Sequence, residues 1–398
     1  MILAIARKSL MYRKSSVIIT ILAMTISVMV MLGVEHIRHQ AKVSFSSSVS
    51  GVDLIVGART GQLNLLLYSV FRMGSPTANI SWQSYENLKQ NKDVKWAVPI
   101  SLGDSHKGYR VLGTTPDYFT FFKYAEEQSL ELQNGAFFQD TFDVVLGHKV
   151  AQQLNYQIGD KIIISHGIGS TSFTKHDKNP FVITGILQAT GTPVDQTVHV
   201  SLQRLEAVHT PAAFQRGLDL TPQSVTAIML GLKSRIKTFS VQRAINTDKQ
   251  EPMTAILPGV ALAEFWQSMA VLENTLQIVS GLVFVSAVLG LTAMLIASIR
   301  ERKEEIRLMR MVGASPFFIV LIIQIEALLI VITSIITALA LLVACLAISK
   351  NYLLTQYAIG INPISLVTNS SFYLISIMGI SSIAALIPAL MAYKGSKR

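Results

Sequence analysis

The chain has 398 residues, of which half are hydrophobic and only 15% are charged, and its formal net charge is +10. A soluble domain of this length carries a larger share of charged residues, so the composition excludes a wholly soluble protein and indicates that part of the chain lies in a membrane. The basic excess could indicate a nucleic-acid partner, but the lysines and arginines cluster beside apolar runs, which favours charge that orients membrane helices and excludes nucleic acid.

The N-terminus predicts a basic entry helix followed by the first membrane span. Residues 1–14 contain four basic side chains, Arg7, Lys8, Arg13 and Lys14, and residues 15–34 then run without a charge. About 20 apolar residues suffice to cross a bilayer as a helix. A basic start before an apolar core is also typical of a cleaved signal peptide. Because the run is long and ends without a small-x-small cleavage site, we expect it to be retained as transmembrane helix 1.

Residues 35–270 predict a large extracytoplasmic α+β domain, because short β-rich runs bounded by Gly, Pro, Asn or Asp alternate with helix-like stretches. The expected strands are residues 53–57, 144–147, 161–165, 181–187 and 198–202. The expected helices include residues 81–90 and 148–154. Residues 167–180 are polar and contain glycine, which predicts a mobile loop. A segment of this length is large enough to bury its own core.

Both ends of this domain show helical apolar spacing that continues into a membrane span. Residues 35–48 follow the first span, and residues 259–273 lead into the second. We therefore expect these two spans to extend outward as stalk helices that carry the domain.

Three further apolar runs are long enough to cross the bilayer. They predict transmembrane helix 2 at residues 271–299, helix 3 at residues 316–349 and helix 4 at residues 372–393. Residues 350–371 form a short external loop, and residues 394–398 form a tail. Cys345 lies inside helix 3 and is the only cysteine, so packing is its expected role, and neither a disulfide nor a cysteine-pair zinc site is predicted.

The basic clusters predict the orientation of the four spans. One cluster precedes helix 1, a second lies in residues 300–315 between helices 2 and 3, and a third follows helix 4. All three can share one face, which the positive-inside rule makes the cytoplasmic face. We therefore expect a multi-pass protein with both termini in the cytoplasm and the α+β domain inserted between transmembrane helices 1 and 2.

The charged segment between helices 2 and 3 predicts a short helix at the membrane surface. Arg300–Glu304 and Arg302–Glu305 have the spacing of helical ion pairs. Its apolar stripe consists of Ile306, Met309 and Val312, widened by Leu308 and Met311. Gly313 suits the position after the helix, where φ is often positive, and Ser315-Pro316 suits the start of the next helix. The residues alone leave open whether this helix docks on a partner or lies passively at the interface.

From Ser298 the segment reads SIRERKEEIRLMRMVGASPFFIVLIIQIEALLI. It resembles the signature of FtsX/MacB-type ABC transporter permeases at Arg300, Glu305, Ile306, Met309-Arg310, Gly313-Ala314-Ser315 and Glu326. Residues 384–392 resemble the last span of that family, residues 6–14 its entry helix, and residues 145–151, 159–161 and 185–193 its periplasmic core domain. The resemblance covers nearly the whole chain, and the order and spacing of these pieces carry it.

The resemblance implies a non-catalytic permease of the bacterial inner membrane, of the type VII class, that transmits ATP-driven motion to its outer domain. The residues it implies for coupling to an ATPase are Arg300, Arg302, Glu304, Glu305, Ile306, Arg307, Met309, Arg310, Gly313, Ala314 and Ser315. The sequence contains no G-x-x-x-x-G-K-[ST] phosphate loop. We therefore expect no cofactor in this chain, with ATP and Mg²⁺ bound by a separate cytoplasmic ATPase, as in lipoprotein-releasing systems of the LolCDE type.

Further partners follow from the same resemblance. Four spans are too few for the family's complex, so we expect a second permease copy, either identical or related. A periplasmic adaptor or binding protein and the membrane lipids complete the expected partners.

Other candidate sites carry weaker signals. Glu326 is a carboxylate inside a span and is therefore a candidate functional group, for which we favour a structural polar contact over proton coupling. Glu35, His36 and His39 could bind a metal, but solvated interface residues are the better interpretation, and we predict no metal site. The histidines of residues 35–270 are scattered, and the run from Gly103 to His106 lacks the order of a catalytic triad. Within that run Gly103-Asp104 predicts a turn.

We therefore expect a permease that drives export or release of a lipoprotein, lipid, peptide or antibiotic. The alternatives are a non-transporting regulatory relay of the FtsX kind, a permease for a metal-linked substrate and a membrane-anchored enzyme. The size of the outer domain favours transport over the relay, and the charged segment disfavours the enzyme. The sequence does not identify the cargo.

Overall fold

The computed structural model describes residues 2–125, 127–138, 142–166, 180–209, 221–357, 365–366 and 370–395. The chain divides into two compact units, described separately below: a helical unit of residues 1–40, 270–353 and 361–398, and an outer unit of residues 41–269 and 354–360. The expected loop at 167–180 lies outside the described residues except for Pro180, as do Lys397 and Arg398 of the tail.

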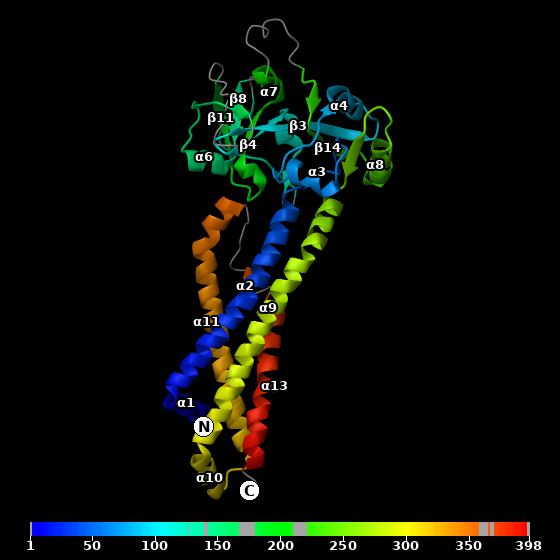
Figure 1. The fold of residues 1–398 in the computed structure, drawn as a ribbon. Helices are drawn as coiled ribbons and strands as arrows, with labels where there is room; N and C mark the ends of the chain where they lie inside the picture. The colour runs from blue at the N-terminus through cyan, green and yellow to red at the C-terminus, as the bar shows by residue number, and fades with distance from the viewer. Residues whose placement is uncertain are drawn as a thin grey trace. The chain divides into compact units, whose positions relative to one another are not determined.

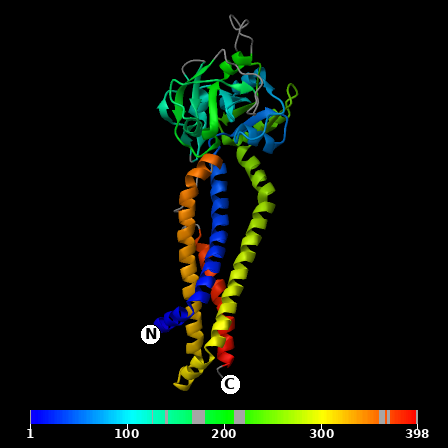
Figure 2. The same ribbon diagram turned by 60° about the vertical axis from the view of Figure 1, so that its left-hand side comes forward.

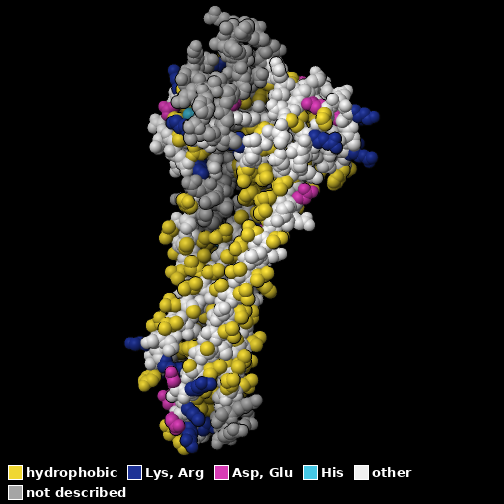
Figure 3. Space-filling model, in the orientation of Figure 1, with side chains coloured by type: hydrophobic (Ala, Val, Ile, Leu, Met, Phe, Trp, Pro, Cys, Tyr) yellow, Lys and Arg dark blue, Asp and Glu magenta, His cyan; other side chains and the backbone are white. Residues whose placement is uncertain are grey.

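Long apolar helices build the helical unit. Its helices are α1 Ile2–Tyr12, α2 Lys14–Ser47, α9 Pro258–Glu301, α10 Lys303–Met311, α11 Pro316–Tyr357 and α13 Ser371–Gly395. Four of them, α2, α9, α11 and α13, are long and apolar enough to cross a membrane. Their flanks are hydrophobic, and charged side chains gather at the end that carries α10 (Figure 3). The predicted fold class, four spans with an α+β domain between the first and second, is confirmed.

Two of these helices are longer than a membrane requires. The 34 residues of α2 and the 44 residues of α9 correspond to about 51 Å and about 66 Å of helix, against a hydrocarbon core of about 30 Å. The predicted continuation of spans one and two into longer helices is confirmed. Helix α11 also continues to Tyr357, past the expected end at residue 349, because no glycine or proline interrupts residues 350–357.

Hydroxyl side chains join the helices of this unit at close range. The Thr25 and Thr337 hydroxyls of α2 and α11 lie 2.8 Å apart, and the Ser27 hydroxyl of α2 donates to the Val283 carbonyl of α9 at 3.4 Å. Such small polar residues let apolar helices approach closely. Helix α1 does not continue the axis of α2 but runs at an angle to it (Figure 2).

The outer unit is built on a sheet of 11 strands (Figure 1). The main path runs β15-β1-β14-β3-β4-β12-β8-β11-β7, with β10 paired to β3 and β9 to β11. Only β4–β12 and β8–β11 are parallel among the described pairs. The strands are β1 Leu54–Ala58, β3 Val94–His106, β4 Tyr109–Thr114, β7 Leu132–Gly135, β8 Asp143–Leu146, β9 Lys161–Ile162, β10 Ser165–His166, β11 Phe181–Leu187, β12 Thr197–Ser201, β14 Ala227–Leu232 and β15 Met253–Ile256.

Short elements cover this sheet. Two small ribbons pair β2 Ile80–Ser81 with β13 Ser224–Val225, and β5 Lys123–Tyr124 with β6 Gln128–Ser129. The helices are α3 Gln62–Ser69, α4 Trp82–Lys89, α5 Asp117–Phe121, α6 His148–Leu154, α7 Leu202–His209 and α8 Thr238–Asn246, with 3-10 turns η1 Pro193–Gln196 and η3 Arg235–Lys237. The β-branched runs form strands because both faces of the sheet are covered, so that all five residues of β1, for example, are buried.

Most predicted elements of this unit are confirmed, and two predictions are wrong. The run 161–165 is not one strand, because β9 pairs with β11 whereas β10 pairs with β3. Gly103-Asp104 is not a turn: both residues belong to β3, where a register shift between Leu102 and Ser105 absorbs the glycine. A β-bulge of this kind accommodates an extra residue without ending the strand.

Candidate functional site

The segment between α9 and α11 is a short helix with defined ends. Helix α9 runs to Glu301, Arg302 is non-helical, and α10 starts at Lys303. At the other end Gly313 has a φ of 99°, its N–H donates to the Arg310 carbonyl, and the Ala314 N–H donates to the Met309 carbonyl at 2.9 Å. This is a Schellman pattern, and Gly313 occupies the position after the helix that the sequence predicted for it.

The next helix begins as its sequence predicted. The Phe318 N–H donates to the Ser315 hydroxyl at 3.2 Å, and Pro316 opens α11. Only a few residues therefore separate two capped helices, so the segment is a folded turn with fixed ends.

Helix α10 has an inner and an outer face. On the inner face Ile306 and Met309 line a narrow crevice with Ile319, Ile322 and Ile323 of α11. The outer face has the spacing of one helical stripe and exposes Glu304, Leu308 and Met311, with Arg307 beside them. Leu308 is 56%, Met311 69% and Val312 89% exposed. The outer face thus alternates charged and apolar side chains.

A buried cluster of charges ties this turn to the rest of the helical unit. Glu326 of α11 is only 1% exposed, and its carboxylate lies 2.9 Å from a guanidinium nitrogen of Arg302 and 3.7 Å from one of Arg13. Arg302 also bonds Glu305 at 2.9 Å. The carboxylate is therefore the shared partner of the α1–α2 junction and the α9–α10 break.

The structure bears out some of the predictions about the site residues and contradicts others. The Arg302–Glu305 pair is confirmed. Glu326 makes polar contacts with Arg302 and Arg13, and its structural role stays a prediction. The Arg300–Glu304 pair is wrong: no ion pair joins these two described residues, because the helix breaks at Arg302 and their i,i+4 geometry is lost. Arg300 belongs to α9 rather than to the short helix. The ion pair of Arg13 with Glu326 was not predicted. A carboxylate buried in a membrane span nevertheless predicts a basic side chain at the same depth in the membrane.

The ends of the two stalk helices meet in an aromatic cluster within the outer unit. Phe45 of α2 lies 4.8 Å from Phe71, 5.9 Å from Phe265 and 5.6 Å from Trp266, measured between ring centroids. Phe265 and Trp266 belong to α9. The Ala125 N–H also donates to the Ser47 carbonyl at 2.8 Å, next to the end of α2. Both helices are thereby attached to the outer domain by packing as well as by the chain.

Buried polar groups of the outer unit are held by backbone and hydroxyl groups. The two ring nitrogens of His106 lie 2.6 Å from the Ile163 carbonyl and 2.9 Å from the Tyr156 hydroxyl, so both nitrogens have partners within the outer unit. His199 is fully buried beside Tyr118 and Phe119, and this burial lowers its pKa to about 3. No three His, Cys, Asp or Glu residues gather as a metal site in the described part of the chain.

Comparison with known proteins matches both parts of the chain. The MacB-like periplasmic core domain family matches residues 17–248, and the FtsX-like permease C-terminal family matches residues 277–398. The lipoprotein-releasing system transmembrane protein LolE of Haemophilus influenzae is 23% identical over 254 residues, which cover 60% of this chain and 57% of that one. The match thus spans little more than half of that relative.

Two solved structures are also similar to part of the chain. The periplasmic region of MacB from Actinobacillus actinomycetemcomitans is 11% identical with a TM-score of 0.36, covering 55% of this chain and 94% of that one. The extracellular domain of YknZ, a noncanonic ABC-type transporter from Gram-positive bacteria, is 14% identical with a TM-score of 0.32, covering 52% and 98%.

Proposed function

We propose, from the premise that this chain belongs to the FtsX- and MacB-like family of ABC transporter permeases, that it couples a separate cytoplasmic ATPase to its outer domain. Members of this family are multi-pass membrane proteins that work with cytoplasmic ABC ATPases. In the proposed cycle, ATP-driven movement of the ATPase shifts α10, and the continuous helices α2 and α9 carry the movement to the outer domain. The result is export or release of a substrate.

The observation that carries the proposal is the outer face of α10. Leu308, Met311 and Val312 are exposed although they are apolar, which is typical of a surface that a partner covers. Glu304 and Arg307 interrupt this surface. A partner protein can bury apolar and charged side chains together, so this exposed face supports docking on a protein.

The buried charge cluster supports coupling because it resists independent movement of α10. A shift of α10 that breaks the Arg302–Glu326 bond leaves charges unpaired in the interior, which costs several kcal/mol. Helices α9, α10 and α11 and the α1–α2 junction would therefore move as one body. The aromatic cluster around Phe45 is the corresponding attachment of both long helices to the outer domain.

The remaining parts of the proposal follow from charge and from the family. The basic residues at the α10 end favour a cytoplasmic position for it in the bacterial inner membrane. The sequence has no phosphate loop, so ATP and Mg²⁺ would bind the partner ATPase. A second permease copy would supply further spans, and no catalytic role is assigned to this chain.

The test is co-purification of the full chain with a co-expressed ABC ATPase from its own genome, together with the ATPase rate of the complex. We expect Glu304→Lys and Leu308→Asp to weaken the complex and to uncouple hydrolysis. Glu305→Lys is a poorer choice, because Glu305 also bonds Arg302. Glu264→Lys is the matched control, since this exposed glutamate lies near the opposite end of α9. An unchanged complex and rate in both α10 variants would refute α10 as the coupling helix.

A further inference from the structure

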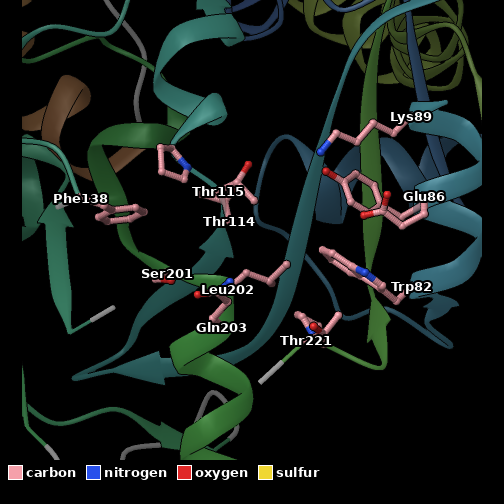
Figure 4. Close-up of a pocket in the computed structure, with 13 residues that line it drawn as sticks. Trp82, Glu86, Lys89, Thr114, Thr115, Phe138, Ser201, Leu202, Gln203 and Thr221 are labelled. Carbon is pink, nitrogen blue, oxygen red and sulfur yellow. The ribbon is translucent and has the colours of Figure 1, made fainter. Parts of the chain in front are cut away.

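A cavity in the outer unit has the composition of a ligand site. Its volume is about 320 Å³, and its lining includes Trp82, Tyr85, Thr115, Phe138, Ser201 and Gln203. Four segments supply these residues: α4, the link between β4 and α5, the stretch after β7 that holds Phe138, and the junction of β12 with α7 (Figure 4). The size and the mixture of aromatic and polar side chains are typical of pockets that bind small ligands.

One end of the cavity is an aromatic wall on a fixed helix. The rings of Trp82 and Tyr85 lie 4.5 Å apart on α4. The start of α4 is anchored because the Glu251 carboxylate accepts from the Ser81 N–H at 2.8 Å and from the Ser81 hydroxyl at 2.7 Å. The backbone N–H of Trp82 donates to the Gln223 carbonyl at 2.9 Å. The wall is thus formed in advance, which reduces the cost of binding.

The other end is also apolar. Phe138 lies there, away from Trp82 in the view of Figure 4, and Pro116 also lines the cavity. The Phe138 ring packs edge-on against Phe119 of the core at 5.0 Å. Two apolar ends therefore bound the cavity.

Polar groups occupy the region between these ends. Thr114, Thr115, Ser201 and Gln203 lie between Trp82 and Phe138 in Figure 4. The Thr115 hydroxyl oxygen is buried and has no hydrogen-bond partner among the described residues. This oxygen has almost no accessible surface, so a ligand reaches it only when the Thr115 side chain rotates toward the cavity. A ligand that then supplies the missing partner gains affinity. Glu86 and Lys89 add one charge of each sign on the α4 side.

We propose that this cavity binds an extended peptide segment in which one apolar residue stands on each side of a small polar residue. The apolar side chains would occupy the Trp82 and Phe138 ends, and the peptide groups between them would bond Thr115 and its polar neighbours. A lipid tail does not match the polar middle, and a phosphate-bearing ligand would meet Glu86 beside the lysine. This inference does not depend on the coupling role proposed for α10.

The test measures binding of two blocked tripeptides to the full chain in nanodiscs by saturation-transfer NMR titration. The probes are acetyl-leucyl-seryl-leucine amide and acetyl-seryl-leucyl-serine amide. We expect the first to bind with a Kd of about 1 mM or below, and about tenfold more tightly than the second. Trp82→Ala should weaken the first probe about tenfold, and Thr115→Val about fivefold, as expected for one lost hydrogen bond.

The matched control is Gln83→Ala, next to Trp82 but exposed and bonded to Asn87 instead of lining the cavity. It should leave both affinities unchanged. Thr115→Val is nearly isosteric and decides the matter if Trp82→Ala fails to fold. Equal binding of the two probes, insensitivity to Thr115→Val, or Trp82-dependent binding of N-acetylglucosamine in place of the tripeptide would overturn the proposal.

A second arm of the experiment separates two sources of the peptide. If the blocked tripeptide binds more tightly than the same tripeptide with free termini, the ligand is an internal segment of a partner protein. If the free form binds more tightly, the ligand is a short free peptide. Either result retains a peptide as the ligand.

Discussion

The helical unit and the outer unit hold their buried charged and titratable groups in different ways. In the helical unit Glu326 is paired with two arginines, so each charge depends on the others. In the outer unit Glu251 accepts from two serines, and His199 is buried next to aromatic rings and a backbone carbonyl. A cluster of buried ions loses its stabilising effect when one of its members is removed, because the remaining charges are then unpaired. A group that is bonded to hydroxyls and backbone atoms loses its stabilising effect mainly when its protonation state changes. The two units should therefore respond to different perturbations.

The largest expected effect is that of Glu326→Gln. This change leaves Arg13 and Arg302 without their shared countercharge in a buried site, and it should lower the unfolding free energy of the helical unit by about 3–5 kcal/mol. The measurement is thermal unfolding of the full chain in detergent. Glu273→Gln is the control, because Arg38 keeps its bond to Glu35 at 2.6 Å and the pair is partly exposed. Its cost should stay below about 1 kcal/mol, and equal costs for the two variants would remove the contrast between buried and exposed pairs.

The next effect is a pH response of the outer unit. Burial holds the pKa of His199 at about 3, against 6.5 for an ordinary histidine, so the unfolded chain takes up a proton that the folded domain excludes. The stabilisation from a neutral His199 is thus present above pH 6.5 and is lost as the pH falls toward 3. Between pH 6.5 and about pH 4 we expect a loss of about 3 kcal/mol.

Near-UV circular dichroism during denaturant unfolding of the full chain would follow this response. The variant His199→Gln cannot titrate and should show a shallower dependence on pH. If the slope is the same with and without the histidine, other groups govern the acid sensitivity of the outer unit.

A smaller effect tests whether the backbone turn at Gly313 stabilises the end of α10. Gly313 has a φ of 99°, so Gly313→Ala places a side chain in the left-handed region and should cost about 1 kcal/mol. Gly290→Ala in the helical interior of α9, where a Cβ meets open space, should instead be neutral or slightly stabilising. Thermal unfolding of both variants gives the comparison, and destabilisation of Gly290→Ala alone would contradict it.

The smallest effect concerns Glu251. Burial alone would raise the pKa of this carboxyl, but hydrogen bonds from Ser84 and Ser81 outweigh burial and hold the pKa below its ordinary value of 4.5. Its stabilisation is therefore present above pH 4.5 and fades as the pH falls through the lower folded value. Glu251→Gln should cost less than about 1 kcal/mol at neutral pH and shift the acid-unfolding midpoint only slightly. A shift as large as that of His199→Gln would show that carboxylates dominate the acid response.

Much of the fold followed from local patterns in the sequence. Apolar run length predicted the four spans, β-branched runs predicted most strands, and Gly313 and Ser315 predicted the ends of two helices because capping depends on neighbouring residues only.

The tertiary contacts of the site did not follow from such patterns. The Arg13–Glu326 pair joins residues that are far apart in the sequence, so no rule based on local residue spacing predicts it. The failed Arg300–Glu304 prediction has a related cause: the spacing was correct, but helix periodicity does not reveal a break at Arg302, whose side chain instead bonds Glu326. The cavity of Figure 4 combines residues from several segments that are far apart in the sequence, and no sequence pattern predicted it.

The two anchored ends of α10 also restrict the evolution of its length. Arg302 is held by Glu326 at one end, and the turn at Gly313 holds the other. Each residue of a helix adds about 100° of rotation. A single insertion or deletion between these anchors would therefore turn Leu308 or Met311 away from any partner while leaving both anchors intact. Substitutions on the outer face of α10 can therefore accumulate, whereas an insertion or deletion that changes its helical register would disrupt contact with a partner.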